Sequence, residues 1–413
     1  MTTPLSKPKK KNPVKRIRMP SLPPGKRSRE AQGLTAMAAV GRFALQVCNE
    51  CEKVQYPPRQ ICGKCLSDKL FWQDVSNGGK LLAETELQHS NDTYFRDRVP
   101  WRLGIVIADA GPSIVAHLGE DCSHGQRVRM SLSIDRAGNA VITARPEKPN
   151  KLEEDDLQLR EMAFDPKDRR VFIVNGKTEL GLRIAENMVA AGAREIFVGS
   201  AEPWRSSSYL EQIKSLERTS IYSLDVTDTE SVKELASMIG DKVEILINNS
   251  YHFRMGGLID RFDINTAHDE MEIHYHGLMR LAAFFGPIMK SRSADGPHGA
   301  AAWLNVLSAY ALINNPDLGT YSASQAAALS LSQCLRSEMA SGGIRVINTF
   351  TGPIEDEWQQ IAPPPKLMTN TVAKHIIKGL QNGMEDIIVG AVAEEICERI
   401  VENTKEIERT IKL

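Results

Sequence analysis

The hydrophobic positions in the second half of the chain gather in short runs, and longer amphipathic segments separate these runs. Each run is apolar at consecutive positions, which is typical of a strand buried on both faces of a parallel sheet. The runs lie at Val171–Val174, Glu195–Val198, Ile245–Ile247, Trp303–Ser308, Gly343–Asn348 and Asp386–Val389. Strands that alternate with helices in this way predict an α/β fold with a doubly wound parallel sheet over residues 169–413.

The first half of the chain has a different pattern, in which short segments alternate polar and apolar positions between Gly, Asp and Asn residues. Alternation with a period of two indicates strands with one buried face. The five segments are Leu81–Gln88, Leu103–Asp109, Ser113–Leu118, Arg127–Ser133 and Ala140–Thr143. Five short strands in succession predict a small Greek-key barrel of the OB type.

Two Cys-x-x-Cys pairs precede the predicted barrel, formed by Cys48, Cys51, Cys62 and Cys65. Thiolates with this spacing can surround a tetrahedral Zn²⁺ without leaving an open position, so the metal would be structural. Disulfides are the alternative, but no signal peptide is recognised, and a reducing compartment favours zinc. We therefore expect a zinc ribbon. The other cysteines are expected to be packed thiols; they are Cys122, Cys334 and Cys397.

Charge and length suggest the domain boundaries and exclude some functions. The 413 residues carry 51 basic and 52 acidic side chains, so no global positive field favours nucleic acid. No apolar run is long enough to span a bilayer, and we expect a cytoplasmic protein. Basic residues and prolines over 1–32 predict a disordered tail. We then assign 33–146 to the ribbon and barrel, 147–168 to a charged linker and 169–413 to the α/β domain.

A serine and a tyrosine in the α/β region carry a family resemblance. Ser308 stands thirteen residues before Tyr321, at the end of a predicted strand. This pair and the order of the strands resemble the short-chain dehydrogenase/reductase family, which has a Rossmann-type sheet. The resemblance implies that Ser308 holds the substrate oxygen and that Tyr321 is the catalytic acid/base. The family places a lysine four residues after the tyrosine, where this chain has Gln325.

The loss of that lysine changes the expected chemistry. A free tyrosine has a pKa of about 10 and needs a lowered pKa to work near neutrality. A lysine one helical turn away would stabilise the phenolate, whereas Gln325 carries no charge. His274 stands where the family has a catalytic asparagine, and we expect it to be structural. We therefore predict a degenerate dehydrogenase domain with lost or weak activity.

The cofactor loop departs from the family pattern as well. The family sequence Thr-Gly-x-x-x-Gly-x-Gly is replaced by Asn175–Gly181, which keeps Gly176 and Gly181 but lacks the middle glycine. Such glycines allow a tight turn and a close approach of the backbone to a pyrophosphate. The resemblance implies that Asp225 and Asn248 also lie at the cofactor site. Because the loop is shortened, we expect NAD(P) binding to be weak or absent.

The front region resembles a second family. The two cysteine pairs, followed by Gln55–Arg59, Phe71, Trp72 and the barrel, resemble the zinc-ribbon/OB acyl-CoA-associated family over residues 40–146. Members of that family are partners of thiolase-fold enzymes, including acyl-CoA thiolases and steroid side-chain aldolases. The aromatic stretch Tyr94–Arg102 could contact acyl-CoA or a partner protein, stack on single-stranded nucleic acid, or pack the end of the barrel. Fusion to a metabolic fold disfavours nucleic acid.

Two functions follow from these resemblances. The first is an accessory or scaffold subunit of an acyl-CoA-metabolising complex. Its ribbon and barrel would dock on a thiolase- or aldolase-type enzyme, and its α/β domain would pair with an active short-chain dehydrogenase. Apolar helices near 262–290 and 321–341 would form that interface in a homo- or hetero-oligomer. The alternative is an active NAD(P)-dependent 3-hydroxyacyl-CoA dehydrogenase, or 3-oxoacyl-CoA reductase, in which Gln325 replaces the lysine.

Overall fold

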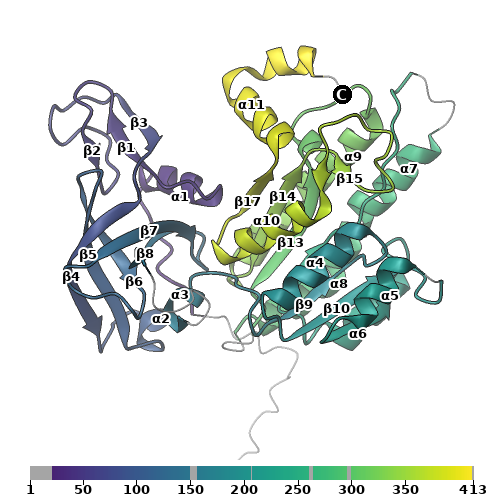
Figure 1. Cartoon of the computed structure of the whole chain (residues 1–413), viewed down its shortest axis with the longest axis horizontal. Coiled ribbons are helices and arrows are strands. Elements are labelled where there is room, and N and C mark those ends of the chain that lie inside the picture. The colour runs from purple at the N-terminus through teal and green to yellow at the C-terminus, as the bar shows by residue number, and fades with distance from the viewer. Residues whose placement is uncertain (1–20, 149–155, 206, 260–263, 295–298, 412–413) are drawn as a thin grey trace, which may run out of the picture.

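A computed structural model of the chain describes residues 21–148, 156–205, 207–259, 264–294 and 299–411. The ribbon and the barrel lie together, and the α/β domain stands beside them (Figure 1). Most of the expected disordered tail, residues 1–20, lies outside the described residues. The rest of the predicted tail begins at Ser21 and contacts the folded protein there, since the Arg98 guanidinium donates to Ser21 Oγ at 3.3 Å.

The ribbon is a three-stranded antiparallel sheet of order β2-β1-β3. Its strands are β1 (Ala44–Cys48), β2 (Val54–Gln55) and β3 (Leu70–Asp74). Helix α1 (Ala31–Ala39) precedes the ribbon and packs its buried residues Leu34 and Ala38 into the core of the barrel. The ribbon and the barrel therefore share one hydrophobic core.

The predicted OB-type barrel is confirmed as a closed barrel of order β4-β5-β6-β8-β7. Buried and exposed residues alternate along the middle strands, as the sequence pattern requires. The inward-facing side chains, among them Leu81, Val106 and Met130, fill the interior. The strands are β4 (Gly78–Leu87), β5 (Trp101–Ala108), β6 (Ser113–Leu118), β7 (Arg127–Ile134) and β8 (Ala140–Pro146).

The aromatic stretch after β4 packs the end of the barrel, which was the structural alternative. Short helix α2 (Thr93–Arg96) places Tyr94 in the interior, and Trp101 at the start of β5 is also buried. Trp101 Nε1 donates to His117 Nδ1 at 2.9 Å, and the ring of Phe95 stacks on the same imidazole. Because Tyr94 and Trp101 are enclosed, they offer no surface for stacking on a ligand.

The α/β domain has a seven-stranded parallel sheet of order β11-β10-β9-β12-β13-β14-β17. The chain runs outward from β9 to β11 and then returns to β12 on the other side of β9. The carboxyl ends of β9 and β12 therefore form the point where a doubly wound sheet binds ligands. The strands are β9 (Arg170–Ile173), β10 (Glu195–Ser200), β11 (Thr219–Ser223), β12 (Ile245–Asn248), β13 (Ala302–Ser308), β14 (Arg345–Thr351) and β17 (Asp386–Val389).

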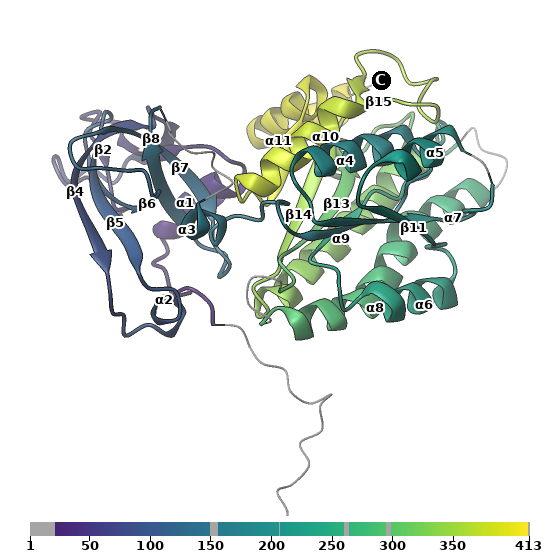
Figure 2. The same cartoon turned by 60° about the horizontal axis from the view of Figure 1, so that its bottom comes forward.

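Helices cover both faces of this sheet. Figure 2 shows the sheet between the two layers of helices. Helices α4 (Glu179–Ala190), α5 (Ser208–Ser215) and α10 (Thr369–Gln381) bury their apolar sides on one face. Helices α6 (Thr229–Ile239), α8 (Gly277–Arg292) and α9 (Gly319–Ala340) cover the other face. Helix α7 (Asn265–Met271) leads into α8 through a π-helical turn at Glu272–His276.

Residues after β14 cover the carboxyl end of the sheet. Two short strands, β15 (Ile354–Glu355) and β16 (Leu367–Met368), pair in parallel on either side of a loop. Helix α11 (Ala391–Thr410) follows β17 and packs Ile396 and Ile407 into a core cluster that also contains Tyr321. Within the described residues, no helix is both long enough and apolar enough to cross a membrane.

The barrel packs against the edge of the sheet at which β14 and β17 begin. Ile134, at the end of β7, donates its backbone N–H to Gly383 O at 3.2 Å, and Glu385 N donates to Ala39 O at 2.8 Å. Arg345, the first residue of β14, is buried in this seam and pairs with Glu385. The barrel domain therefore contacts the sheet at the amino ends of β14 and β17.

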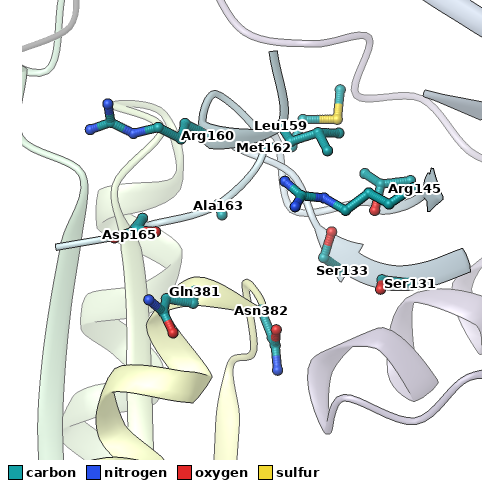
Figure 3. A pocket seen from close by; sticks show the side chains of 11 residues that line it. Ser131, Ser133, Arg145, Leu159, Arg160, Met162, Ala163, Asp165, Gln381 and Asn382 are labelled. Atoms are coloured by element: carbon teal, nitrogen blue, oxygen red, sulfur yellow. The ribbon is translucent and has the colours of Figure 1, made fainter. Parts of the chain in front are cut away.

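The described part of the connection between the domains is packed into the same seam. Helix α3 (Leu157–Arg160) lies beside the barrel, and buried Phe164 donates its N–H to Leu380 O at 3.0 Å. A small cavity of about 60 Å³ remains between β7, β8, this connection and the end of α10. Figure 3 shows side chains from each segment around it, including Ser133, Arg160 and Gln381. Residues 156–168 therefore belong to the interface.

Candidate metal centre and dehydrogenase site

The four cysteines of the ribbon converge on one point. Their Sγ atoms all lie within 4.8 Å of one another, with 3.5 Å between Cys48 and Cys65 and 3.6 Å between Cys51 and Cys62. Four thiolates about 2.3 Å from a tetrahedral Zn²⁺ would be separated by about 3.8 Å. The donor set and its spacing therefore fit a structural zinc ion, with no position left for a substrate.

Backbone turns prepare this cluster for the metal. Each pair closes the same turn, since Glu52 N donates to Cys48 O at 2.9 Å and Leu66 N donates to Cys62 O at 3.1 Å. Backbone N–H groups of Cys65 and Lys64 lower the pKa of the Cys62 thiol to about 6. A thiol with a lowered pKa is more readily deprotonated, which is the form that binds zinc. Among the other cysteines, Cys122 is buried, whereas Cys334 is exposed on α9 rather than packed.

In the α/β domain, the structure brings Ser308 and Tyr321 together. Ser308 ends β13, and Tyr321 lies in the first turn of α9, so the end of the strand faces the start of the helix. Burial raises the pKa of Tyr321 well above its usual value, and the hydrogen bond with Ser308 only partly offsets this effect. The phenol is 6% exposed, and its ring packs edge-to-face on Phe253 at 5.0 Å. A buried phenol with a raised pKa is poorly suited to exchange protons near neutrality.

Gln325 does not replace the missing lysine at the phenol. Its side-chain oxygen Oε1 accepts a hydrogen bond from the backbone N–H of Ser308 at 3.0 Å. This contact fixes the end of β13 against α9 but supplies no positive charge to Tyr321. Gln325 is itself buried. It therefore acts as a structural link across the site.

His274 is a structural residue, as expected. Its Nε2 accepts from the backbone N–H of His252 at 2.9 Å, and its Nδ1 lies 2.8 Å from Ser324 Oγ. The Ser324 hydroxyl already donates to Tyr321 O at 2.8 Å, so Nδ1 must be the donor to Ser324. Burial lowers the pKa of His274 to about 3, which keeps the imidazole neutral. Both ring nitrogens are therefore engaged, one with the backbone N–H of His252 and the other with the Ser324 hydroxyl.

A cleft of about 700 Å³ opens at the switch point of the sheet. Apolar side chains form one part of its wall, including Leu224, Val226 and Ile273, which suits a flat base. The loop after β9 forms another part. Packing requires glycine both at Gly176 in that loop and at Gly181 in the first turn of α4. A Cβ atom would lie 2.4 Å from Val198 Cγ1 at Gly176 and 2.1 Å from the carbonyl oxygen of Asn175 at Gly181.

The loop after β9 is less suited to a pyrophosphate than the family pattern. Thr178 caps α4 by accepting the N–H of Gly181 at Oγ1, at 3.1 Å, so this donor is already used. Glu179 follows at the first helical position and pairs with Arg183 at 3.3 Å. A carboxylate there satisfies the helix dipole, which would otherwise attract phosphate.

Charges at the rim of the cleft are arranged around one carboxylate. Lys177 Nζ lies 2.9 Å and Arg205 Nη1 lies 3.5 Å from Glu202 Oε2. The hydrogen bond from Lys177 lowers the pKa of Glu202. Asp225 and Glu357 also line the cleft. The charged lining residues are therefore two cations and three carboxylates.

The cleft ends before it reaches the Ser308–Tyr321 pair, and neither residue is among the residues that line it. Tyr251 stands at this end, and its phenol donates to Asp356 Oδ2 in the loop after β15. Trp358 from the same loop also lines the cleft. Tyr251 also packs against the buried cluster that contains Tyr321, so it lies at the boundary between the cleft and the Ser308–Tyr321 pair. The apolar part of the cleft wall therefore suits an adenine base, whereas the Ser308–Tyr321 pair lies outside the lining of the cleft.

The cofactor residues expected from the resemblance take different places. Asp225 lines the cleft, Gly176 lies in the loop that bounds it, and Gly181 lies in the first turn of α4. Asn248 lies beneath the cleft: it is buried, and its Nδ2 donates to Asn305 Oδ1 at 3.4 Å. The contact of Tyr251 with Asp356 at the cleft was not predicted. A bulky side chain where the family has the glycine of its Asn-Asn-Ala-Gly motif was the available signal.

The strand order, the cleft at the switch point and the Ser308–Tyr321 pair define the α/β region as a short-chain dehydrogenase domain. Comparison with known families agrees, since residues 169–364 match the family described as short chain dehydrogenase. Residues 35–70 match the ChsH2 rubredoxin-like zinc ribbon domain, and residues 72–133 match the ChsH2 C-terminal OB-fold domain. The chain thus joins a ChsH2-type ribbon and barrel to a dehydrogenase domain.

Individual proteins resemble the dehydrogenase domain at modest identity. A fatty acyl-CoA reductase of Acinetobacter baylyi is 26% identical over 239 residues, covering 55% of this chain and 74% of the relative. A 3-dehydrosphinganine reductase of Arabidopsis thaliana is 26% identical over 242 residues, covering 55% and 71%. A short-chain dehydrogenase of Burkholderia cenocepacia, solved with NADP, is 28% identical with a TM-score of 0.54, covering 59% of this chain and 98% of that one.

Proposed function

We propose that this protein is an accessory subunit of an acyl-CoA-metabolising complex whose dehydrogenase domain does not transfer hydride. The observation that carries the proposal is the environment of Tyr321. The phenol is buried, Gln325 is turned to the backbone of Ser308, and Tyr251, which lines the cleft, packs against the cluster that contains the phenol. A domain whose acid is neither activated nor part of the lining of the cleft keeps the fold but not the reaction.

The outer face of the barrel supports docking to a partner enzyme. Leu82, Ile105, Ile107 and Val115 are exposed on β4, β5 and β6, and Ile105 lies directly opposite Val115. Contiguous exposed apolar side chains are typical of protein interaction sites. The family resemblance of the ribbon and barrel indicates that the partner is a thiolase- or aldolase-type enzyme.

A second apolar hollow supports pairing of the dehydrogenase domain with an active short-chain dehydrogenase. It lies between α8 and α9, has a volume of about 480 Å³, and is lined by Ala282, Gly286 and Leu331 among others. Met279 in its lining is half exposed. These are the helices whose apolar side chains predicted an interface, and the partner could be a second copy or a different subunit.

Enzyme assays on the full chain test the loss of activity. The assay measures the rate at which NADH and NADPH are oxidised in the presence of 3-oxoacyl-CoA substrates. The rate with the Tyr321→Phe variant serves as the background. We expect the unmodified protein to match that background, because loss of general-acid tuning alone costs a factor on the order of 10²–10⁴. Gln325→Lys should not restore turnover, since Tyr321 remains buried and outside the lining of the cleft. Turnover on the order of 10 per second would support the alternative, an active 3-oxoacyl-CoA reductase.

Isolation of the native complex tests the accessory role. The tagged full chain, purified from its own cells, is expected to bring down a thiolase-fold enzyme, an active short-chain dehydrogenase, or both. Ile105→Asp in the barrel face should remove only the first partner, and Met279→Asp between α8 and α9 should remove only the second. A chain that is monomeric and free of enzymes of acyl-CoA metabolism would refute the role.

A further inference from the structure

The cavity of about 60 Å³ between β7, β8, residues 156–168 and the end of α10, here called the seam cavity, has mainly polar walls. On β7 and β8 the apolar side chains fill the barrel, so Ser131, Ser133, Thr143 and Arg145 face outward. An isolated barrel would expose these residues to water, but here the connection between the domains and the end of α10 cover them (Figure 3). Polar groups in a covered position need hydrogen-bond partners.

The described residues do not supply these partners. The side chains of Ser133, Thr143, Gln381 and Asn382 line the cavity, and none of them makes a hydrogen bond to another described residue. Ser133 is only 7% exposed. Its hydroxyl points into the cavity, toward the guanidinium of Arg145 (Figure 3). The polar atoms around the cavity are therefore available to a molecule inside it.

The charges at the seam cavity favour an anion. The described charged residues in its lining are Arg145, Arg160 and Asp165, so the cations outnumber the carboxylate. Asp165 Oδ1 is engaged by the backbone N–H of Lys167 at 2.9 Å. On the sheet itself, Arg129 of β7 lies directly opposite Arg145 of β8. Like charges directly opposite each other destabilise a pair of strands, and an anion beside Arg145 would relieve this repulsion.

We propose that the seam cavity binds one small tetrahedral oxyanion, inorganic phosphate or sulfate, which joins the barrel to the dehydrogenase domain. Guanidinium, hydroxyl and amide groups donate hydrogen bonds, and the oxygens of such an ion accept them. The volume equals that of about two water molecules at about 30 Å³ each, which suits one ion and is too small for a nucleotide. Ser131 at the edge of the cavity is exposed, so the ion can exchange with solvent. The inference does not depend on whether the dehydrogenase domain is active.

Calorimetric titration of the full chain tests the proposal with sodium phosphate, sulfate, acetate and chloride as probes, all at the same ionic strength. We expect one phosphate or sulfate ion to bind per chain, at least tenfold more tightly than acetate or chloride. Hydrogen exchange followed by mass spectrometry then tests where the ion binds. Phosphate should slow exchange both in residues 156–168 and at the end of α10, because a bound ion opposes local opening of the segments that it contacts.

Variants from both domains test the residues of the site. Arg145→Met should weaken phosphate binding by about tenfold or more, because a charge-assisted hydrogen bond is lost. Arg129→Met is the matched control on the neighbouring strand: its side chain is exposed and outside the lining, so salt screens its charge and binding should change by less than about threefold. Ser133→Ala in the barrel and Gln381→Met on α10 should each weaken binding by about three- to tenfold, since each removes one hydrogen bond.

Several results would overturn this inference. They are no saturable binding of phosphate or sulfate, equally tight binding of chloride, or binding that Arg129→Met weakens as much as Arg145→Met. Binding that Arg145→Met, Ser133→Ala and Gln381→Met all leave unchanged would show an adventitious ion only. Circular dichroism checks that each variant is folded, and if Arg145→Met is not, the other two decide. Turnover of a 3-oxoacyl-CoA would refute the proposed function and leave this inference standing.

Discussion

Replacing His274 with asparagine should change how the stability of the dehydrogenase domain depends on pH. His274 is fully enclosed and neutral, and both of its ring nitrogens hold neighbouring groups. Unfolding releases the imidazole to water, where its pKa returns to about 6.5. Below that pH the imidazole of His274 binds a proton in the unfolded chain but stays unprotonated in the folded protein. The neutral imidazole therefore stabilises the fold fully above pH 6.5, and this contribution is lost as the pH falls toward 3.

The size of the effect follows from the two pKa values. Burial lowers the pKa of His274 to about 3 from an ordinary value of 6.5. At pH 5 the unfolded state is then almost fully protonated at this site and the folded state almost unprotonated, which lowers the free energy of unfolding by about 2 kcal/mol relative to pH 8. His274→Asn removes this titration. At pH 8 the variant should itself be less stable by about 1–3 kcal/mol, since His252 N and Ser324 lose partners.

Urea unfolding at pH 8 and pH 5, followed by far-ultraviolet circular dichroism, measures the difference. The change in unfolding free energy between the two pH values should be smaller by about 2 kcal/mol in the variant than in the parent protein. Burial also lowers the pKa of His117 in the barrel to about 4. Because parent and variant share this residue, its contribution to the pH dependence cancels in the comparison. His375→Asn, on the exposed side of α10, is the matched control. Equal pH dependence in parent and His274→Asn would refute the assignment of a buried neutral imidazole.

Three further changes test the ribbon, the seam and the loop. The parent protein should contain one zinc per chain by elemental analysis. Cys62→Ser should lose the zinc and unfold the ribbon while the dehydrogenase domain stays folded. A freshly purified parent protein without zinc would contradict this prediction. Arg345→Met should destabilise the protein by about 3–5 kcal/mol in urea, because Glu385, whose side chain is 13% exposed, is left without its partner. Adding Glu385→Leu should recover part of the loss, and no recovery would argue against the pair. Gly181→Ala should lower the unfolding free energy by about 1–3 kcal/mol, since its Cβ would lie 2.1 Å from Asn175 O, and an unchanged melting temperature would show that the loop can move aside.

Elements with a strong local pattern could be predicted from the sequence. Continuous apolar runs such as Val171–Val174 became strands buried on both faces, and the alternating segments became the strands of the barrel. Strand β11 (Thr219–Ser223) was not predicted as a strand, because its Thr, Ser and Tyr residues lack a continuous apolar run. It lies at the edge of the sheet, where half-buried side chains suffice.

The candidate site was harder to predict because its decisive contacts join distant residues. The Cys-x-x-Cys pairs are local, so the metal cluster could be placed from spacing alone. Tyr251 and Asp356 are 105 residues apart, and neither carries a pattern that names the other. The orientation of Gln325 toward the Ser308 backbone likewise depends on how α9 meets β13. The sequence identified the missing lysine, but only the structure shows that Tyr321 is buried and lies outside the lining of the cleft.

The seam between the domains has a consequence for how the molecule positions its neighbours. The barrel joins the sheet where the strands β14 and β17 begin, whereas the nucleotide cleft opens where the strands end. Backbone hydrogen bonds and the Arg345–Glu385 ion pair hold this arrangement, so the barrel and the opening of the cleft lie at opposite ends of the strands. A protein held at one end and a nucleotide held at the other would not compete for room. Their separation would be set by the length of the strands and not by the reach of a tether.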